Sequence, residues 1–257
     1  GVGYEQLAGF LSGYAEDLGV ARVVAFNFRG VGSSQGEPTR AADLVDDATA
    51  VINFAIDRLA ADPRHLVLHG WSLGGGVALA ARQRFPHAVV VSDRSFAVLS
   101  DVAKYMLSDP ISAGSLGLFA GFLVSFVSTS KPSLMLDRIK VVSAALGVLF
   151  AAGALNPFLP QLLRALEWEL DASDPALLYS APICCIYHRK DGIIAYDGGS
   201  LHPLLDVARD SVFELELTKE FESGLSPRHH LYAVRTSVGE WEPMLSCIRD
   251  AMGAASL

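Results

Sequence analysis

The sequence has few cysteines, no excess of basic residues and no cluster of residues with the spacing of metal ligands. Three cysteines are too few for the disulfide framework of a small secreted domain, and they fit a reducing compartment. We interpret the adjacent pair, Cys184 and Cys185, as small apolar residues of a buried strand. The net charge of −8 and the lack of a basic stripe argue against nucleic acid as a partner. No metal or other cofactor is expected.

The chain also begins without an initiator methionine, a signal peptide or a basic leader. It opens on Gly1-Val2-Gly3, directly before a helical pattern, so we expect further strands upstream. The localisation expected from this is cytoplasmic or membrane-associated. At 257 residues, 51% of them hydrophobic, the sequence suits one large domain or a core with an inserted segment.

The most informative stretch is Val67–Gly76, which reads VLHGWSLGGG and contains Gly-x-Ser-x-Gly centred on Ser72. A strand-like run precedes it and an Ala-rich helical stretch follows it. Strand, sharp turn and helix with a serine at the apex are typical of a nucleophile elbow, whose strained backbone exposes the hydroxyl. We expect a side chain at Gly70 or Gly74 to crowd this turn. The alternative is a glycine-rich turn whose serine only caps the helix.

Apolar periodicity predicts alternating helices and strands along the rest of the chain. Helical spacing is present at Tyr4–Leu18, Arg40–Leu59, Val77–Phe85 and Glu242–Met252. Short apolar runs predict strands at Arg22–Phe28, His65–Leu68, Ala88–Ser92, Pro182–Tyr187 and Val212–Leu217. Continuous apolar strands alternating with helices indicate an α/β fold, with a mostly parallel sheet covered by helices on both faces. Ligands of such sheets bind beyond the carboxyl ends of the strands.

The middle of the chain departs from this alternation. Neither Ile111–Ser130 nor Val141–Leu163 carries a charge. We therefore assign residues 1–99 and 181–257 to the core, and residues 100–180 to an insertion.

Two structures of this insertion are compatible with its composition. The favoured one is an apolar helical cap over the pocket, because Pro157 and Pro160 interrupt the second run. The alternative is a hairpin that dips into or spans a membrane, with contact through residues 111–163, because both runs are long enough to cross a bilayer. Both imply an apolar substrate.

An acid and two histidines follow later strands in the order that an elbow enzyme requires. Asp191 comes after one predicted strand, and His229 and His230 come after the next. The order Ser, Asp, His fits a triad, in which histidine exchanges the proton and the acid orients its ring. Glu214 and Glu216 are fallback candidates for the acid.

The remaining polar residues near these strands have simpler interpretations. Asp93 and Arg94 are expected to form a local ion pair that shapes the pocket, with substrate contact as the alternative. We expect His65, His87 and His202 at the surface or in loops.

Four stretches, in this order and each at a predicted strand end, resemble the α/β-hydrolase superfamily. They are FNFRGVGSSQG at Phe26–Gly36, HGWSLGG at His69–Gly75, YHRKDGII at Tyr187–Ile194 and RHHLYA at Arg228–Ala233. The resemblance runs from Gly1 to the C-terminus and implies the α/β-hydrolase fold, in which a cap often occupies the position of the insertion. More narrowly, SDRSF at Ser92–Phe96 and KDGIIAYDGGSL at Lys190–Leu201 resemble bacterial predicted hydrolases of the CHLPS type.

The resemblance implies roles for particular residues. It makes Ser72 the nucleophile, Asp191 the acid and a histidine of the pair at 229–230 the base. Several family members carry a His–aromatic-or-His–apolar–Tyr–Ala stretch in which the first residue is catalytic, which favours His229, with His230 as the alternative.

The oxyanion hole implied by the resemblance consists of two backbone N–H groups. One belongs to Leu73, the residue after the nucleophile, and the other to the Gly-rich start of the chain at Val2 and Gly3. The strand that supports the second loop in the family is absent from this sequence, so the hole is the less secure half of the expected site.

These features predict a serine hydrolase, esterase- or lipase-like, acting on a small-molecule or lipid ester or thioester with an apolar acyl group. The reaction would pass through an acyl-enzyme and need no cofactor. The alternative is a non-catalytic protein of the same fold, serving interaction or membrane association. Acyl transfer to an acceptor other than water is a third interpretation.

Overall fold

A computed structural model describes residues 8–108, 156–221, 224–225, 227–237 and 239–255. Its centre is a sheet of four parallel strands in the order β1-β2-β3-β4. The strands are β1 (Val67–Trp71), β2 (Val89–Asp93), β3 (Ile183–Tyr187) and β4 (Val212–Glu216). The register pairs Trp71 with Asp93, and Asp93 with Ile186, so the carboxyl ends of the strands meet at one edge.

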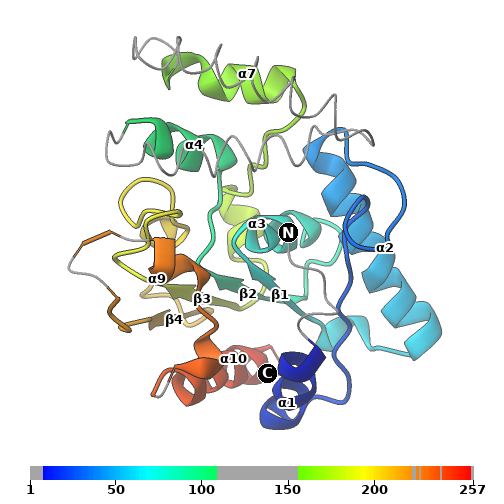
Figure 1. The fold of residues 1–257 in the computed structure, drawn as a ribbon. Coiled ribbons are helices and arrows are strands. Elements are labelled where there is room, and N and C mark those ends of the chain that lie inside the picture. The colour runs from blue at the N-terminus through cyan, green and yellow to red at the C-terminus, as the bar shows by residue number, and fades with distance from the viewer. Residues whose placement is uncertain (1–7, 109–155, 222–223, 226, 238, 256–257) are drawn as a thin grey trace.

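Helices cover both faces of this sheet. The longer ones are α1 (Ala8–Leu18), α2 (Ala41–Leu59), α3 (Leu73–Ala81), α4 (Leu99–Ser108) and α10 (Trp241–Ala254). The shorter ones are α7 (Leu159–Ala165), α8 (Pro175–Leu178) and α9 (Pro227–Leu231). Figure 1 shows α1 and α10 below the sheet and α3 above it, with α2 alongside α3. The predicted α/β fold is confirmed.

The alternation of side chains along each strand divides the core into two layers. Val91 and Cys184 pack on one face with residues of α1 and α10. Val90 and Cys185, their neighbours in sequence, pack on the other face with α3. Both faces of β2 and β3 are buried along their whole length, which is why VVV of β2 and ICCI of β3 read as continuous hydrophobic runs, whereas β4 alternates between buried or half-buried and exposed residues.

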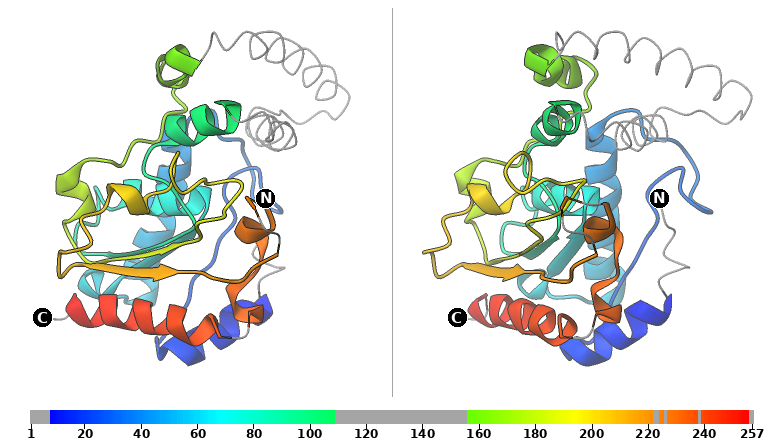
Figure 2. Two further views of the ribbon diagram at one scale, coloured as in Figure 1. Left: turned by 90° about the vertical axis from the view of Figure 1, so that its left-hand side faces the viewer. Right: turned by 60° about the vertical axis from the view of Figure 1, so that its left-hand side comes forward.

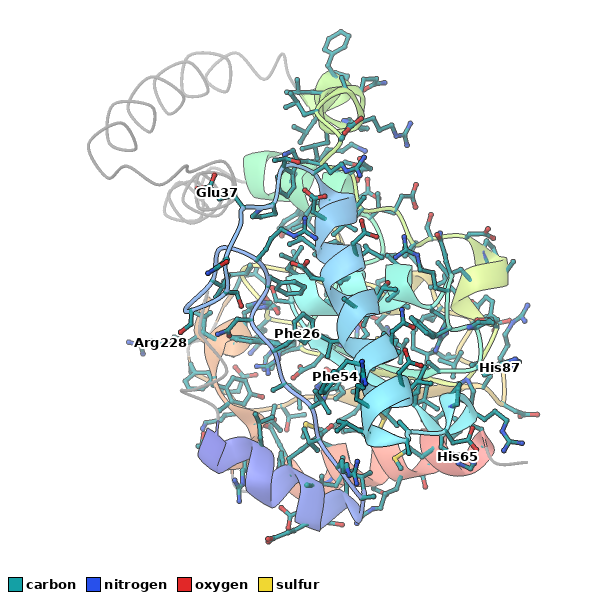
Figure 3. The ribbon with its side chains drawn as sticks, turned by 90° about the vertical axis from the view of Figure 1, so that its right-hand side faces the viewer. Phe26, Glu37, Phe54, His65, His87 and Arg228 are labelled. Carbon is teal, nitrogen blue, oxygen red and sulfur yellow. A yellow bond between two sulfur atoms is a disulfide. The ribbon has the colours of Figure 1, made fainter. Side chains whose placement is uncertain are left out.

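The strand predicted at Arg22–Phe28 is wrong. This segment pairs with no strand in the described part of the chain. Phe26 and Phe28 instead pack against the core cluster that α2 shares with α3, in the region that Figure 3 shows. The Arg29 side chain donates to Asp47 of α2 at 2.6 Å and 2.9 Å. Packing onto the helix therefore accounts for the two phenylalanines, whereas Val23 and Val24 are exposed.

The interpretation of the cysteines needs correction as well. Cys184 of β3 forms a disulfide with Cys247 of α10, with a Cα–Cα distance of 6.1 Å. Only Cys185, which faces away from α10, is a free buried thiol. The bond joins residues 63 positions apart, a contact that the packing of α10 on β3 creates and that sequence spacing did not reveal. The inference of a reducing compartment from unpaired cysteines therefore no longer applies.

Much of the predicted insertion lies outside the described residues, because residues 109–155 are not among them. The cap and the membrane hairpin both stay predictions. On either side of this gap, α4 packs against α7, as Figure 2 shows. Phe158, Leu162 and Leu166 lie one helical turn apart along α7 and are 62%, 40% and 56% exposed. In the described part of the chain, no helix has the length and apolar character needed to cross a membrane.

Candidate active site

Ser72 occupies a sharp turn between β1 and α3. Its backbone angles, φ 55° and ψ −123°, are rarely adopted by a residue with a side chain and cost about 1–3 kcal/mol. The turn is held by a hydrogen bond from the Ser72 N–H to the Asp93 carbonyl at 3.0 Å. The Ser72 side chain makes no capping hydrogen bond to α3. The geometry is therefore that of an elbow, and the alternative of a helix-capping serine is not supported.

The glycines of this turn differ in whether a side chain would fit in their place. A Cβ on Gly70 would lie 2.1 Å from the carbonyl oxygen of Gly74, so only glycine fits there. A Cβ on Gly74 would meet nothing within 4 Å, so the expectation of crowding is confirmed at Gly70 and wrong at Gly74. A Cβ on Gly75 would lie 2.4 Å from the Ser95 side chain, because the loop after β2 packs directly on the elbow.

Asp191 and His230 form a buried pair at the carboxyl end of β3. The Asp191 Oδ2 lies 2.7 Å from Nδ1 of His230, and the two side chains are 1% and 3% exposed. The other oxygen, Oδ1, accepts hydrogen bonds from the N–H groups of Ile193 and Ile194, both at 2.8 Å. An ionised carboxylate only accepts, so Nδ1 of His230 carries the proton and Nε2 keeps a lone pair. This is the tautomer that a general base requires.

His229, the preferred candidate for the base in the sequence, has different partners. Its Nδ1 lies 2.8 Å from the Lys190 carbonyl, and its Nε2 accepts the Phe221 N–H at 3.2 Å. Both ring nitrogens are therefore engaged by the backbone. Adjacent residues on α9 point in different directions, and this orientation brings His230 rather than His229 to Asp191.

The ring of Trp71 connects the histidine to the elbow. Trp71 is the last residue of β1 and directly precedes Ser72. Its ring stacks on the imidazole of His230, with centroids 5.6 Å apart and planes inclined by 26°. The structure thus brings Asp191, His230 and the elbow to the same edge of the sheet. The sequence analysis did not single out Trp71, although its position within the motif was a signal.

One of the two expected donors of the oxyanion hole lies among the described residues. Leu73 is the first residue of α3, and the amides of the first helical turn have no acceptor within the helix. Val2 and Gly3 lie outside the described residues.

The predicted ion pair of Asp93 and Arg94 is confirmed, with Nε and Oδ1 2.7 Å apart. Both side chains are buried, 8% and 3% exposed. Burial by itself would raise the pKa of Asp93, but the charge of Arg94 and the proximity of His69 outweigh it and lower that pKa. Burial likewise opposes the charge of Arg94, and Asp93 raises its pKa in compensation. The pair is therefore fully ionised.

The fallback acids have other partners. Glu214 pairs with His202, and Glu216 pairs with Arg189 at 3.0 Å. His202 is buried, contrary to expectation, because its ring stacks on Tyr187 of β3. His65 and His87 are exposed as predicted (Figure 3). In the described part of the chain, no three His, Cys, Asp or Glu side chains are grouped to hold a metal ion.

The comparison with protein families matches the part of the chain that contains the elbow. A family model described as the alpha/beta hydrolase fold matches residues 4–110, which include Ser72. The chain belongs to the α/β-hydrolase superfamily. The fold of this α/β-hydrolase agrees, because its elbow stands between a parallel strand and a helix at the carboxyl edge of the sheet. The match does not extend to Asp191 or His230.

Several curated relatives resemble part of this α/β-hydrolase. An uncharacterized protein, YfhR of Escherichia coli O157:H7, is 36% identical over 88 residues, which are 33% of this chain and 31% of the relative. Phosphatidylserine lipase ABHD16A of Bos taurus is 33% identical over 90 residues, 34% of this chain and 16% of the lipase. A multifunctional-autoprocessing repeats-in-toxin protein of Vibrio cholerae is 36% identical over 56 residues, 22% of this chain and 1% of the toxin. The similarity thus spans a third or less of each relative.

Proposed function

We propose that this α/β-hydrolase is a serine hydrolase that cleaves an ester or thioester with an apolar acyl group. Ser72 is the nucleophile, His230 the base and Asp191 the acid. The observation that carries the proposal is the buried Asp191–His230 pair, whose protonated Nδ1 leaves Nε2 as the basic nitrogen. The His230 ring stacks on Trp71, the residue before Ser72. Ser72 itself has the strained backbone of an elbow.

The proposed reaction follows from these groups. Nε2 of His230 takes the proton of the Ser72 hydroxyl as its oxygen attacks the substrate carbonyl. Asp191 stabilises the imidazolium that forms, since its carboxylate is held in place by two backbone N–H groups. The N–H of Leu73 is one donor to the tetrahedral oxyanion, and Val2–Gly3 is the expected second. The alcohol or thiol leaves with the proton from His230, and water then releases the acyl group.

Three observations support an apolar acyl group. The segments around residues 111–130 and 141–163 carry no charge. Within the insertion, Leu162 of α7 and the flanking residues Phe158 and Leu166 add exposed apolar surface. One relative of this chain is a phosphatidylserine lipase. We therefore propose a lipid or lipid-like ester as substrate, with membrane contact through residues 111–163.

A fluorophosphonate probe tests the nucleophile directly, because it reacts with activated serines. The wild-type protein should be labelled, and Ser72→Ala should lose all labelling. Ser180→Ala is the matched control, since Ser180 lies far along the chain from the elbow and its hydroxyl donates to the Leu177 carbonyl at 3.0 Å. Labelling of Ser72→Ala, or a folded wild-type protein that is never labelled, would contradict the proposal and favour the non-catalytic alternative.

A further inference from the structure

The loop that follows β2 contacts both halves of the proposed site. Arg94 and Ser95 begin this loop, directly after Asp93, the last residue of β2, at the centre of the sheet edge. All three residues are buried, and Arg94 adopts a positive φ of 46°, a conformation that a residue with a side chain rarely takes. A buried charge in a strained backbone needs strong partners to persist, and the partners of Arg94 are specific.

One set of partners is the backbone around the proposed base. Nη1 of Arg94 donates to the carbonyl oxygens of His230 and Tyr232, both at 2.9 Å, and lies 3.4 Å from that of His229. The guanidinium also lies over the Tyr232 ring, 4.9 Å from its centroid. The helix α9 that carries His230 has only five residues, so it cannot hold its own position by internal hydrogen bonds. The guanidinium supplies the fixed point instead.

The other set of partners belongs to the elbow. The Asp93 carbonyl accepts the Ser72 N–H at 3.0 Å, and the Ser95 hydroxyl donates to the Ser72 carbonyl at 2.5 Å. Arg94 itself lies 5.7 Å from the ring centroid of Trp71, the residue before Ser72. Three consecutive residues thus hold the backbone of the nucleophile and the backbone of the base together.

We infer that Arg94 is a positioning residue for the proposed base, holding the backbone of His230 so that the imidazole meets both Asp191 and the elbow. The inference rests on the proposed function for its effect on rate. Its structural content, that Arg94 maintains the Asp191–His230 hydrogen bond, stands independently of whether Ser72 reacts.

The chemistry of the contacts requires arginine rather than any cation. Asp93 takes two donors of the guanidinium, Nε at 2.7 Å and Nη2 at 3.1 Å, and leaves Nη1 for the carbonyl groups. A lysine has one nitrogen, which cannot occupy both ends of this arrangement. Arg94→Lys therefore keeps the charge and the approximate volume but loses the link to α9.

The chain contains a matched control in Arg82 of the α3 C-cap. Arg82 is also buried, and it donates to the carbonyl oxygens of Leu178 at 3.0 Å and Pro182 at 2.6 Å. None of its recorded partners belongs to the proposed site. Losing either guanidinium should destabilise the fold, so a comparison of the two variants separates positioning from stability.

The experiment measures three quantities on the whole chain for wild type, Arg94→Lys, Arg94→Gln and Arg82→Lys. They are the thermal midpoint, the rate of fluorophosphonate labelling per folded protein, and the downfield NMR signal of the proton between Asp191 and His230. Asp191→Asn assigns that signal by abolishing it. We expect both Arg94 variants to lose or shift the signal and to be labelled about 10- to 100-fold more slowly. Arg82→Lys should lower the thermal midpoint and leave the other two unchanged.

Each outcome has a distinct meaning. An unchanged NMR signal and labelling rate in Arg94→Lys, despite a lowered thermal midpoint, would overturn the inference. Failure of both Arg94 variants to fold while Arg82→Lys folds would also overturn it, since Arg94 would then be a folding residue. If wild type is never labelled, the proposed function fails, but a signal lost in the Arg94 variants and kept in Arg82→Lys would still support the positioning role.

Discussion

Two pairs of a histidine and an acid lie near the end of β3. They differ in their exposure to solvent and in the partners of their ring nitrogens. In the pair of Asp191 and His230, both side chains are almost fully buried. In the pair of His202 and Glu214, the glutamate side chain is 44% exposed. Solvent screens the second pair, whereas the first lies in a low-dielectric environment where a hydrogen bond orients and polarises the imidazole more strongly.

The free nitrogen of each histidine separates the pairs further. His202 has both ring nitrogens engaged, with the Tyr196 hydroxyl 2.9 Å from Nδ1 and Glu214 at Nε2. His230 contacts Asp191 through Nδ1 and stacks on Trp71, and within the described part of the chain no hydrogen bond engages its Nε2, which the proposed mechanism uses to take a proton. An acid beside a histidine is therefore not sufficient for that histidine to act as a general base. The imidazole also needs an unoccupied nitrogen and a nucleophile within reach.

Removing the two neighbouring histidines one at a time is expected to give the largest contrast. His230→Ala should lower the rate of ester hydrolysis by about 10⁴-fold or more, as expected for the base of a triad. His229→Ala should change the rate less than tenfold, but it should lower the thermal midpoint, because two partly buried backbone groups lose their hydrogen bonds. Hydrolysis of a short-chain nitrophenyl ester and a thermal melt measure the two effects. If His229→Ala abolished turnover and His230→Ala did not, the assignment would be reversed.

Neutralising each acid gives the next largest contrast. Asp191→Asn should reduce kcat by about 10³- to 10⁴-fold, because an amide at this position no longer stabilises the imidazolium. Glu214→Gln should leave kcat within about twofold, since His202 serves the packing around Tyr187. Steady-state kinetics on both variants decide the point. A comparable loss in Glu214→Gln would show that the exposed pair takes part in the reaction.

The last contrast lies in the elbow and is read as a difference in stability between two glycine substitutions. Gly70→Ala should destabilise the protein, because its Cβ would lie 2.1 Å from a backbone carbonyl. Gly74→Ala should be neutral or stabilising by up to about 1 kcal/mol, since its Cβ meets nothing and alanine favours the helix. Chemical denaturation of the two variants measures the difference. Equal destabilisation by both would show that the turn is crowded at both glycines after all.

The parts of this molecule that local sequence determines were predictable. The strands β1 to β4 and helices α2 and α10 lie within a few residues of their predicted positions, because their apolar patterns match their burial. The elbow was predictable for the same reason, since its turn is encoded within five residues. The order of Ser, Asp and His along the chain also limited the candidates to a few residues.

The parts that depend on contacts between distant residues were not predictable. Nothing in the motif RHHLYA indicates which histidine points to Asp191, because the choice depends on how α9 turns after β4. The partners of Arg94 lie about 135 residues away along the chain. The pattern at Arg22–Phe28 resembled a strand because the run is rich in β-branched and aromatic residues, but only Phe26 and Phe28 pack against the core cluster.

The disulfide between Cys184 and Cys247 has a topological consequence. It closes a covalent ring of residues 184–247. Asp191, His229 and His230 lie within this ring, and Ser72 and Arg94 lie outside it. Closing a loop of this size lowers the conformational entropy of the unfolded chain. In the chain-entropy model this raises the free energy of the unfolded state by about 4 kcal/mol at 25 °C. Acid and base therefore stay tethered to each other even when the oxidised chain unfolds.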